Sequence, residues 1–336
     1  MPAEWETHEA TWLSWPKNTT TFPPDILPDV ERTYVKMVES LATGEKVIVL
    51  VDDANTESKV RTMLQSKYNV FFQMIKSVDV WMRDYGPIFV KKDSKVALTK
   101  WIFNAWGNKY DDLLPDNEAG LKIAKSTGLQ IFEPGIVLEG GSIDVNGKGT
   151  LLTTKQCLLN QNRNPKLNHE EIGWHLKEFL GATNIIWLDS GIEGDDTDGH
   201  VDDTARFVNE GTVIAMSEDD SSDVNHQALR NNYDSLGNAR DQDGQRLNVV
   251  EVQMPGKFVS NESRLPASYA NFYIGNSVVL VPTFDDPMDG RALETISKFF
   301  RERKVLGINC TSLVWGFGSI HCVTQQQPSY TTNLHY

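Results

Sequence analysis

The sequence has few cysteines, no long apolar run and a deficit of positive charge. Its 336 residues include three cysteines, an odd number that is too small for a disulfide framework. The clearest apolar runs, 47–51 and 278–281, have the length of strands and are far shorter than a membrane span. The opening M-P-A-E-W-E-T-H-E carries carboxylates where a signal peptide would need basic and then apolar residues. These features predict a reducing, cytoplasmic environment and no membrane partner.

The charge balance disfavours nucleic acid as the main partner. Lys and Arg together number 32 and Asp and Glu 46, so the formal net charge is 32 − 46 = −14. A protein that binds the phosphate backbone needs Lys and Arg to displace counterions. The acidic surplus is compatible with a small cationic substrate, although acidity also serves solubility.

Helical and strand-like patterns alternate along the whole chain. An amphipathic helix at 29–43 is followed by an apolar strand at 46–51. We expect Asn55 to cap the next helix, and Asn168 with Glu171 to form the capping arrangement of a later one. The alternation predicts an α/β fold with parallel or mixed sheets. The other expected elements are strands at 69–75, 184–188, 212–216, 277–281 and 304–308, and helices at 168–180 and near 222–236 and 289–302.

We expect one domain, because no Gly-, Ser- or Pro-rich linker and no low-complexity segment divides the sequence. One internal echo is visible, since E-G-G-S-I-D (139–144) and G-F-G-S-I-H (316–321) share the tripeptide G-S-I. A match of three residues arises easily by chance, so the echo is only a hint of a repeated unit.

Two carboxylates interrupt apolar patterns beside glycine. Asp84, in W-M-R-D-Y-G-P (81–87), precedes a Gly-Pro break and an apolar strand, where it can face a cleft. The alternative is that Arg83 and Asp84 form a surface or structural pair. Glu139 ends an apolar strand before two glycines that let the backbone or a ligand approach closely. The sequence leaves open whether Glu139 lies beside a ligand or at the solvated end of a strand.

The acid-rich segment 194–203 contains His200 and Asp202. If it enters a strand, both side chains point to the same face, which suits an imidazole that works beside a carboxylate. The rival interpretation is a metal site, since acid-rich loops bind hard cations. The spacing differs from that of a calcium loop, however, and no second histidine stands at a zinc-ligand interval.

Cys322 follows a glycine-rich turn and enters a short strand, a position that presents a side chain to a cleft. Cys157 and Cys310 lie beside apolar strand patterns and are expected to be small buried residues. A cysteine in a glycine-rich context, with a distant histidine and several carboxylates, indicates a nucleophile. A cysteine protease or a transamidase uses the same elements, so these features leave the electrophile open.

Several motifs carry a family resemblance when they are taken together and in order. They are W-M-R-D-Y-G-P, V-L-E-G-G-S-I, D-G-H-V-D-D-T-A-R-F-V and G-S-I-H-C-V-T-Q-Q-Q-P, with the opening P-A-E-W-E-T-H-E-A-T-W-L-S-W-P and the segment R-L-P-A-S-Y-A-N-F-Y. The set closely resembles the agmatine deiminase branch of the bacterial-type peptidylarginine deiminase family, within the guanidine-modifying superfamily. The resemblance extends from about residue 2 to residue 328, which is nearly the whole chain.

The resemblance implies a five-bladed α/β propeller, the pentein fold, in which five ββαβ units surround a pseudo-fivefold axis with the active site at the centre. It implies a single catalytic domain at 1–328, followed by a C-terminal tail at 329–336 that the resemblance does not cover. The alternating pattern alone does not distinguish a propeller from an open sheet.

Matched motif by motif, the resemblance places the catalytic cysteine at Cys322 and a His–Asp pair at His200 and Asp202. It places two further guanidinium-binding carboxylates at Asp84 and Glu139. The implied reaction hydrolyses agmatine to N-carbamoylputrescine and ammonia through a covalent thiouronium on the cysteine. The histidine is the implied acid and base, and no metal or cofactor is implied.

Several points about the substrate and the assembly stay open at the level of sequence. Trp81 is a candidate to cover the guanidinium face, although a tryptophan there also suits packing. Free or peptide-bound arginine is an alternative substrate, and Arg163, Arg206 and Arg264 are then candidates to bind its carboxylate. A non-catalytic agmatine- or polyamine-binding protein is a further alternative, and the sequence does not say whether the chain forms a homo-oligomer.

Overall fold

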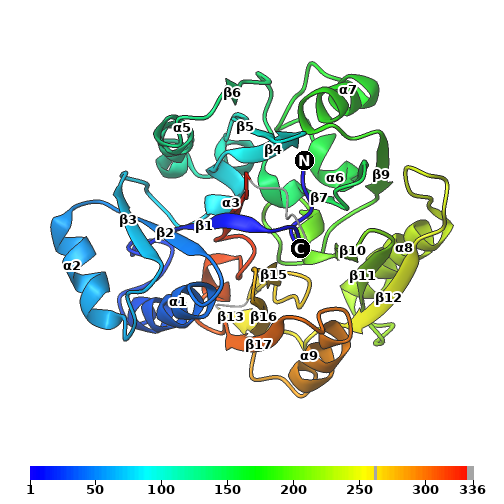
Figure 1. The fold of residues 1–336 in the computed structure, drawn as a ribbon. Coiled ribbons are helices and arrows are strands. Elements are labelled where there is room, and N and C mark those ends of the chain that lie inside the picture. The colour runs from blue at the N-terminus through cyan, green and yellow to red at the C-terminus, as the bar shows by residue number, and fades with distance from the viewer. Residues whose placement is uncertain (261–262, 331–336) are drawn as a thin grey trace.

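The computed structural model describes residues 1–260 and 263–330. Its sheets lie around the centre of the molecule, and its longer helices lie at the periphery (Figure 1). Of the tail expected at 329–336, residues 331–336 lie outside the described residues.

The strands are β1 (His8–Ser14), β2 (Lys46–Val51), β3 (Val70–Met74), β4 (Ile88–Lys92), β5 (Lys95–Thr99), β6 (Ile131–Phe132), β7 (Ile143–Val145), β8 (Thr150–Thr154), β9 (Asn184–Leu188), β10 (Ala205–Asn209), β11 (Thr212–Ser217), β12 (Asn248–Gln253), β13 (Val259–Ser260), β14 (Ser263–Arg264), β15 (Tyr273–Ile274), β16 (Val278–Thr283), β17 (Lys304–Asn309) and β18 (Gln325–Pro328). The helices are α1 (Leu27–Leu41), α2 (Ala54–Met63), α3 (Met82–Tyr85), α4 (Ala105–Asn108), α5 (Asp116–Ser126), α6 (Lys155–Leu158), α7 (His169–Leu180), α8 (Val224–Asn238) and α9 (Asp289–Ser297). Short 3₁₀ helices are η1 (Asp111–Leu113), η2 (Gly140–Ser142), η3 (Val201–Asp203) and η4 (Val314–Gly316).

Within the described residues, five mixed sheets share one plan. In each, two antiparallel strands are followed by a third strand that is parallel to the second. A parallel pair needs a crossover connection, which a helix supplies here. The α/β class predicted from the sequence is confirmed, and of the parallel and mixed pairings that the sequence left open, the sheets have the mixed one. The five units are β4-β5-α5-β6, β7-β8-α7-β9, β10-β11-α8-β12, β15-β16-α9-β17 and β18-β1-α1-β2.

One sheet joins the two ends of the described chain. Strand β1 pairs antiparallel with β18, so that Trp12 lies opposite Gln325 and Ala10 opposite Gln327. The indole N–H of Trp12 donates to the side-chain oxygen of Gln327 at 2.9 Å. Because Cys322 lies three residues before β18, this pairing also helps to fix the position of the cysteine.

Several predicted elements form within the expected bounds. Strands β2 and β9 coincide with the predicted 46–51 and 184–188. The capping box of α7 is confirmed, because the Asn168 side chain accepts from the backbone N–H groups of Glu170 and Glu171, and Glu171 accepts from the Asn168 N–H. The same helix ends at Gly181, whose φ of 72° lies in the left-handed region that favours glycine.

Two helix boundaries were predicted wrongly. Asp53, not Asn55, caps α2, because its carboxylate accepts from the N–H of Thr56 at 2.8 Å. Both residue types cap helices well, so composition does not choose between them. Helix α9 ends at Ser297 rather than near 302, since the following residues turn with i→i−3 hydrogen bonds that bring Phe300 into the core.

Two segments predicted to be strand-like are not strands. Residues 201–203 form the 3₁₀ helix η3 with His200 as its N-cap, so the alternation of a strand does not apply there. Before Glu139 only an isolated bridge between Ile102 and Val137 forms, and Glu139 is the N-cap of η2. Both segments turn sharply where their side chains enter the centre of the molecule.

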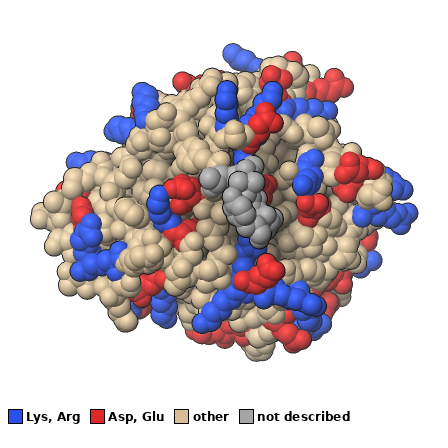
Figure 2. Space-filling model, viewed as in Figure 1, with Lys and Arg blue, Asp and Glu red and all other residues tan. Residues whose placement is uncertain are grey.

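None of the helices within residues 1–260 and 263–330 is both long and apolar enough to cross a bilayer. Basic and acidic side chains are interspersed over the face in Figure 2. In the interior, Val278–Val281 of β16 are all buried, as expected for a strand that is covered on both faces.

Replacement of Asn168 by alanine should lower the free energy of unfolding by about 1 kcal/mol, because the first turn of α7 loses its capping acceptor. Urea denaturation measures the effect. Asn55→Ala is the matched control, since Asn55 is exposed and is not a cap. Equal losses for the two variants would contradict the assigned cap.

Candidate active site

Asp84 lies in the short helix α3 (Met82–Tyr85) and is held at both oxygens. Its Oδ2 accepts from the indole N–H of Trp106 at 3.0 Å, and its Oδ1 accepts from the N–H of Gly141 at 3.0 Å. Burial, and then the charge of Glu139, raises the pKa of Asp84 to about 7. The carboxylate is thus fixed in position and poorly compensated in charge.

Trp106 reaches Asp84 from a strained backbone. Ala105, Trp106 and Asn108 have φ values of 51°, 54° and 60°, and Gly107 between them has a φ of 91°. Left-handed non-glycine residues cost about 1–3 kcal/mol each and are found most often at functional sites. Sequence analysis missed Trp106, although the asparagines and glycine that surround it in N-A-W-G-N (104–108) are residues that tolerate this conformation.

His200 lies between two carboxylates. Its Nδ1 is 3.8 Å from Asp84 Oδ1 and its Nε2 is 4.0 Å from Glu139 Oε2. Among the described residues, neither ring nitrogen has a hydrogen-bond partner. The residue is positioned through its backbone N–H, which donates to Asp195 at 2.9 Å. Burial, and then the charge of Arg163, lowers the pKa of His200 well below its usual range, so the imidazole is neutral.

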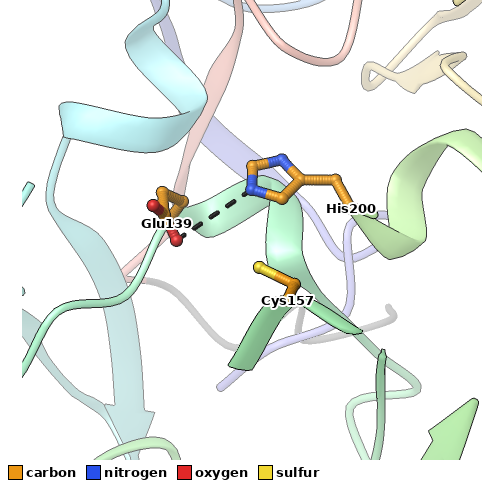
Figure 3. A group of neighbouring side chains, drawn as sticks. All are labelled: Glu139, Cys157 and His200. Atoms are coloured by element: carbon orange, nitrogen blue, oxygen red, sulfur yellow. Dashed lines mark ion pairs between the residues drawn. The ribbon is translucent and has the colours of Figure 1, made fainter. Parts of the chain in front are cut away.

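Glu139 is buried, and only one of its oxygens is occupied. Its Oε1 accepts from Arg163 Nε at 2.7 Å, whereas Oε2 has no hydrogen-bond partner among the described residues. Arg163 is held in turn by Asp198 and by the carbonyl of Thr197, each at 2.6 Å. Burial raises the pKa of Glu139 despite the opposing charge of Arg163. Figure 3 shows the free side of Glu139 facing the imidazole of His200.

Cys157 lies beside the same pair (Figure 3). It is a buried free thiol, as predicted, but its neighbours include Glu139 and His200. One ligand atom from each of the three lies within 4.8 Å of the others. A metal ion there would share Glu139 with the guanidinium of Arg163, and the repulsion between the two cations makes the donor set a poor fit for a metal.

Asp202 contacts His321 rather than His200. Its Oδ2 is 2.7 Å from His321 Nδ1, and His321 Nε2 is 2.9 Å from Glu4 Oε2. The expected pairing of His200 with Asp202 on one strand face is wrong, because the segment is helical. His200 and Asp202 nevertheless both approach Gly141. A Cβ added to this glycine would lie 2.5 Å from His200 Nδ1 and 3.1 Å from Asp202 Oδ2.

Sequence analysis missed His321 and Glu4. His321 stands directly before the cysteine in S-I-H-C, and that adjacency is the signal that could have drawn attention to it. Glu4 is separated from His321 by 317 residues, so no local pattern links them. Their contact depends on the closure of the β1–β18 sheet.

Cys322 is held beside the carboxylates. Its sulfur lies 3.9 Å from Asp202 Oδ2 and accepts a hydrogen bond from the side-chain N–H of Asn271 at 3.1 Å. Its carbonyl accepts from the N–H of Arg83 at 3.1 Å. Burial, and then the charges of Asp202, Asp203 and Asp84, raises the pKa of the thiol well above its usual range.

Arg83 does not pair with Asp84, so the alternative of a surface ion pair is wrong. Both residues are buried. Arg83 donates to Gln326 at 2.7 Å and to Glu4 at 3.2 Å, on the side of the site that contains His321. The Asp84 carboxylate therefore has no ion pair with Arg83, and it faces a cavity.

The cavity, of about 220 Å³, opens onto part of this site, whereas His200, Glu139 and Asp202 are not among the residues that line it. Cys322, Asp84 and Trp81 line it, and two further carboxylates, Asp112 and Asp196, lie in its wall. None of the described residues that line it is Lys or Arg. The cavity is smaller than the roughly 300–1,000 Å³ of sites for drug-sized ligands, which suits a small molecule.

The site residues come from equivalent places in the five units. They precede the first strand of each unit: Asp84 before β4, Glu139 before β7, His200 and Asp202 before β10, Asn271 before β15 and Cys322 before β18.

The two G-S-I tripeptides both precede the first strand of a unit but at different distances, since Ile143 is the first residue of β7 and Ile320 lies before Gln325, where β18 begins. A Cβ on Gly141 would lie 2.9 Å from Asp84 Oδ1, and one on Gly318 would lie 2.4 Å from the Trp81 ring and 3.1 Å from Cys322. Both glycines are required because side chains approach the backbone too closely for a Cβ.

Removal of one negative charge should make the Cys322 thiol more reactive. In Asp84→Asn the pKa of the thiol should fall, because a carboxylate that disfavours the thiolate is gone. The rate of alkylation by iodoacetamide should therefore rise at any pH below that pKa. Mass spectrometry follows the reaction at each of the three cysteines, and Asp189→Asn, at an exposed carboxylate, is the control. An unchanged rate would contradict the assigned electrostatics.

Comparisons with known proteins agree with the motif resemblance. The Porphyromonas-type peptidyl-arginine deiminase family matches residues 1–328. The agmatine deiminase of Stutzerimonas stutzeri is 36% identical over 353 residues, which cover 98% of this chain and 95% of that protein. The structure of an agmatine deiminase of Enterococcus faecalis has a TM-score of 0.91 at 31% identity and covers 98% of this chain and 96% of its own.

Two more structures separate the family from the wider fold. A C. jejuni agmatine deiminase with a cysteine-to-serine substitution and substrate bound has a TM-score of 0.89 at 31% identity, with 98% of this chain and 96% of that chain covered. An amidinotransferase from Microseira wollei has a TM-score of 0.54 at 12% identity, with 99% and 98% covered, and shares the fold alone. Full-length similarity at more than 30% identity confirms the motif resemblance, and the chain belongs to the Porphyromonas-type peptidyl-arginine deiminase family.

Proposed function

We propose that the protein hydrolyses agmatine to N-carbamoylputrescine and ammonia. By homology the chain is an agmatine-deiminase-like hydrolase. One observation carries the finer proposal: the Cys322 thiol and the Asp84 carboxylate line the same small cavity, which no Lys or Arg of the described chain lines. A nucleophile beside uncompensated carboxylates suits a cationic electrophile such as a guanidinium.

The carboxylates supply the binding geometry. A guanidinium presents N–H groups at fixed angles and forms strong paired hydrogen bonds with carboxylates. Asp84 and Asp202 both border the point where a Cβ of Gly141 would lie, and Asp202 Oδ1 has no hydrogen-bond partner among the described residues. We assign these two carboxylates to the guanidinium edges and Glu139 to the orientation of His200. Trp81, in the cavity wall, is assigned to the guanidinium face.

The bound cation also prepares the nucleophile. In the free protein the carboxylates and burial keep the Cys322 thiol protonated, and His200 is neutral. A guanidinium between the carboxylates offsets their charge, so the pKa of the thiol falls and the neutral imidazole can take its proton.

The chemistry then proceeds in two stages. The Cys322 thiolate attacks the central guanidinium carbon, His200 gives a proton to one NH₂ group, and ammonia leaves as the C–N bond breaks. A covalent S-alkylthiouronium remains on the cysteine. His200 takes a proton from water, whose oxygen attacks the same carbon, and the C–S bond breaks to release the ureido product and the thiol. Each step uses protein side chains, so the proposal invokes no metal or cofactor.

The cavity favours agmatine over arginine. An arginine enzyme needs a cation for the α-carboxylate, and the three arginines considered from the sequence are each paired with a carboxylate of the protein and do not line the cavity. Arg163 pairs with Glu139, Arg206 with Glu4, and Arg264 with Asp223. The cavity wall instead contains Asp112 and Asp196, which suit the distal ammonium of agmatine.

The same proposal covers the architecture. We propose that the five ββαβ units form a five-bladed propeller with pseudo-fivefold symmetry, supported by the equivalent positions of the site residues. The proposed catalytic domain is 1–328. We also propose a cytoplasmic location, which the small number of cysteines supports.

Ammonia release from agmatine, free arginine and an arginyl peptide, measured side by side, tests the function. We expect turnover of agmatine to exceed that of both others, because the wall of the cavity is acidic. Cys322→Ala should lose at least about 10³-fold in kcat, whereas Cys310→Ala, at another buried free thiol, should keep the parent rate. Binding of agmatine without ammonia release by the intact chain would instead indicate a non-catalytic binding protein.

Gly141→Ala should reduce kcat/KM for agmatine by at least about 10²-fold, because the new Cβ would displace His200 and Asp84 from their productive positions. Gly173→Ala is the matched control, since its Cβ would meet no atom closer than 3.7 Å and lies in a helix that prefers alanine. Circular dichroism verifies that both variants fold. Equal activities of the two variants would contradict the placement of Gly141 in the site.

A further inference from the structure

His321 lies between two carboxylates that have different roles. Its Nδ1 is 2.7 Å from Oδ2 of Asp202, which with Asp84 forms the proposed guanidinium clamp, and its Nε2 is 2.9 Å from Glu4 Oε2. Of the two clamp carboxylates, Asp84 lines the cavity and Asp202 lies behind the lining residues. His321 and Asp202 are both buried. The imidazole therefore connects the clamp to an interior acid.

Glu4 is fixed as an anion by its other partners. It accepts from Arg206 at 2.9 Å, from Arg83 at 3.2 Å and from the N–H of Ile274 at 2.8 Å. Burial alone would raise its pKa, but the charges of Arg206 and Arg83 and the hydrogen bond from His321 hold that pKa well below the usual range. Glu4 therefore accepts a hydrogen bond from His321 and donates none.

The two short contacts determine how many protons the cluster contains. An ionised carboxylate donates no hydrogen bond, and a neutral imidazole has one N–H. A neutral His321 between two ionised carboxylates would donate a hydrogen bond to one of them and would point the lone pair of its other ring nitrogen at the second, which is repulsive. Both contacts are hydrogen bonds only when Asp202, His321 and Glu4 together carry two protons. One of these is on Nε2 and faces Glu4, and the other lies between Asp202 and Nδ1.

We infer that His321 and Asp202 share this second proton, which is on Asp202 in the free protein and moves to His321 when a guanidinium binds against Asp202. The O–H bond of Asp202 breaks and the Nδ1–H bond of His321 forms, so no proton leaves the protein. His321 acts through Asp202 and is a positioning residue. The inference rests on the proposed function, because it needs a guanidinium in the site.

The surrounding charges agree with this placement. Asp202 is faced by the acids Asp84, Asp195 and Asp203, by the Cys322 thiol, by neutral His200 and, on the other side, by Arg83 and Arg206. Burial, and then the charge of Asp84, raises the pKa of Asp202 well above its usual range.

The same balance holds at the imidazole. His321 is faced by Glu4 and Asp202 and by the cations Arg206 and Arg83. Burial, and then these two arginines, lowers its pKa well below the usual range. A guanidinium beside Asp202 favours the ionised carboxylate, and that new anion favours the imidazolium next to it.

Proton release on binding tests the inference. Cys322→Ala serves as the parent, so that agmatine binds without turnover, and calorimetry in buffers of different ionisation enthalpy counts protons. Neither His321→Gln nor His321→Asn accepts a proton, so Asp202 must lose its own to water. At about pH 6 each variant should release up to one proton more than the parent, and its log affinity should rise with pH more steeply by the same number.

His8→Gln is the matched control, because His8 is also buried with one ring nitrogen 3.1 Å from a carboxylate, that of Glu45. It should keep the parent proton count. Equal counts and slopes in the parent and in the folded His321 variants would overturn the inference.

A second measurement needs no change at His321. In the parent labelled with ¹⁵N-histidine, saturation with agmatine should convert an imidazole to imidazolium, and a spectrum in which none of the seven histidines gains a proton would overturn the inference. Failure of the proposed function is distinguishable, because the intact chain would then release no ammonia and the parent would bind no agmatine.

Discussion

The burial of several carboxylates around one thiol is the constraint on which the rest of the structure depends. An ionised carboxylate in a dry interior is costly unless a cation lies beside it. Glu139 has Arg163, and Glu4 has Arg83 and Arg206. Asp84 has hydrogen bonds from an indole and a backbone N–H but no ion pair with Lys or Arg among the described residues, and its pKa is raised to about 7. In the proposed function a cationic substrate relieves this arrangement, so that selectivity and activation of the thiol share one cause.

The fold produces this concentration of charge by repeating one position. Each ββαβ unit places the segment before its first strand at the centre, where a turn or a single helical turn presents side chains and backbone N–H groups together. Five such segments supply a thiol, an imidazole, three acids and an amide donor from residues far apart in the sequence. The antiparallel pairing of β1 with β18 adds Glu4 and His321 to the same network. A substitution that weakens this pairing would therefore act on the clamp as well as on stability.

The sequence predicted the α/β class, several element boundaries and, through the motifs, the residues that gather at the centre, because these depend on local pattern and on short segments. It did not predict how those residues pair. The expected contact of His200 with Asp202 assumed a strand, whereas η3 turns Asp202 toward His321. The indole that holds Asp84 comes from a left-handed run that no periodicity reveals. The contact between Glu4 and His321 spans 317 residues and exists only after the ends of the chain pair.

Two buried arginines lie on one side of the site, beside Glu4, and the cavity on the other side is lined by carboxylates without Lys or Arg among the described residues. This division leaves the negative charge of the cavity without a cation among the described residues that line it. Arg83 and Arg206 are permanently charged and lie with Glu4 behind His321, where they fix one acid and disfavour a positive imidazole. If either guanidinium instead paired with Asp84, it would occupy the hydrogen-bonding positions that a substrate guanidinium needs, and the clamp would be saturated by the protein itself. The chain avoids this by directing Arg83 away from the carboxylate that follows it in sequence, into hydrogen bonds with Gln326 and Glu4. The adjacent residues Arg83 and Asp84 thus have different roles. Arg83 neutralises Glu4 in the interior, and Asp84 remains available to the proposed guanidinium ligand.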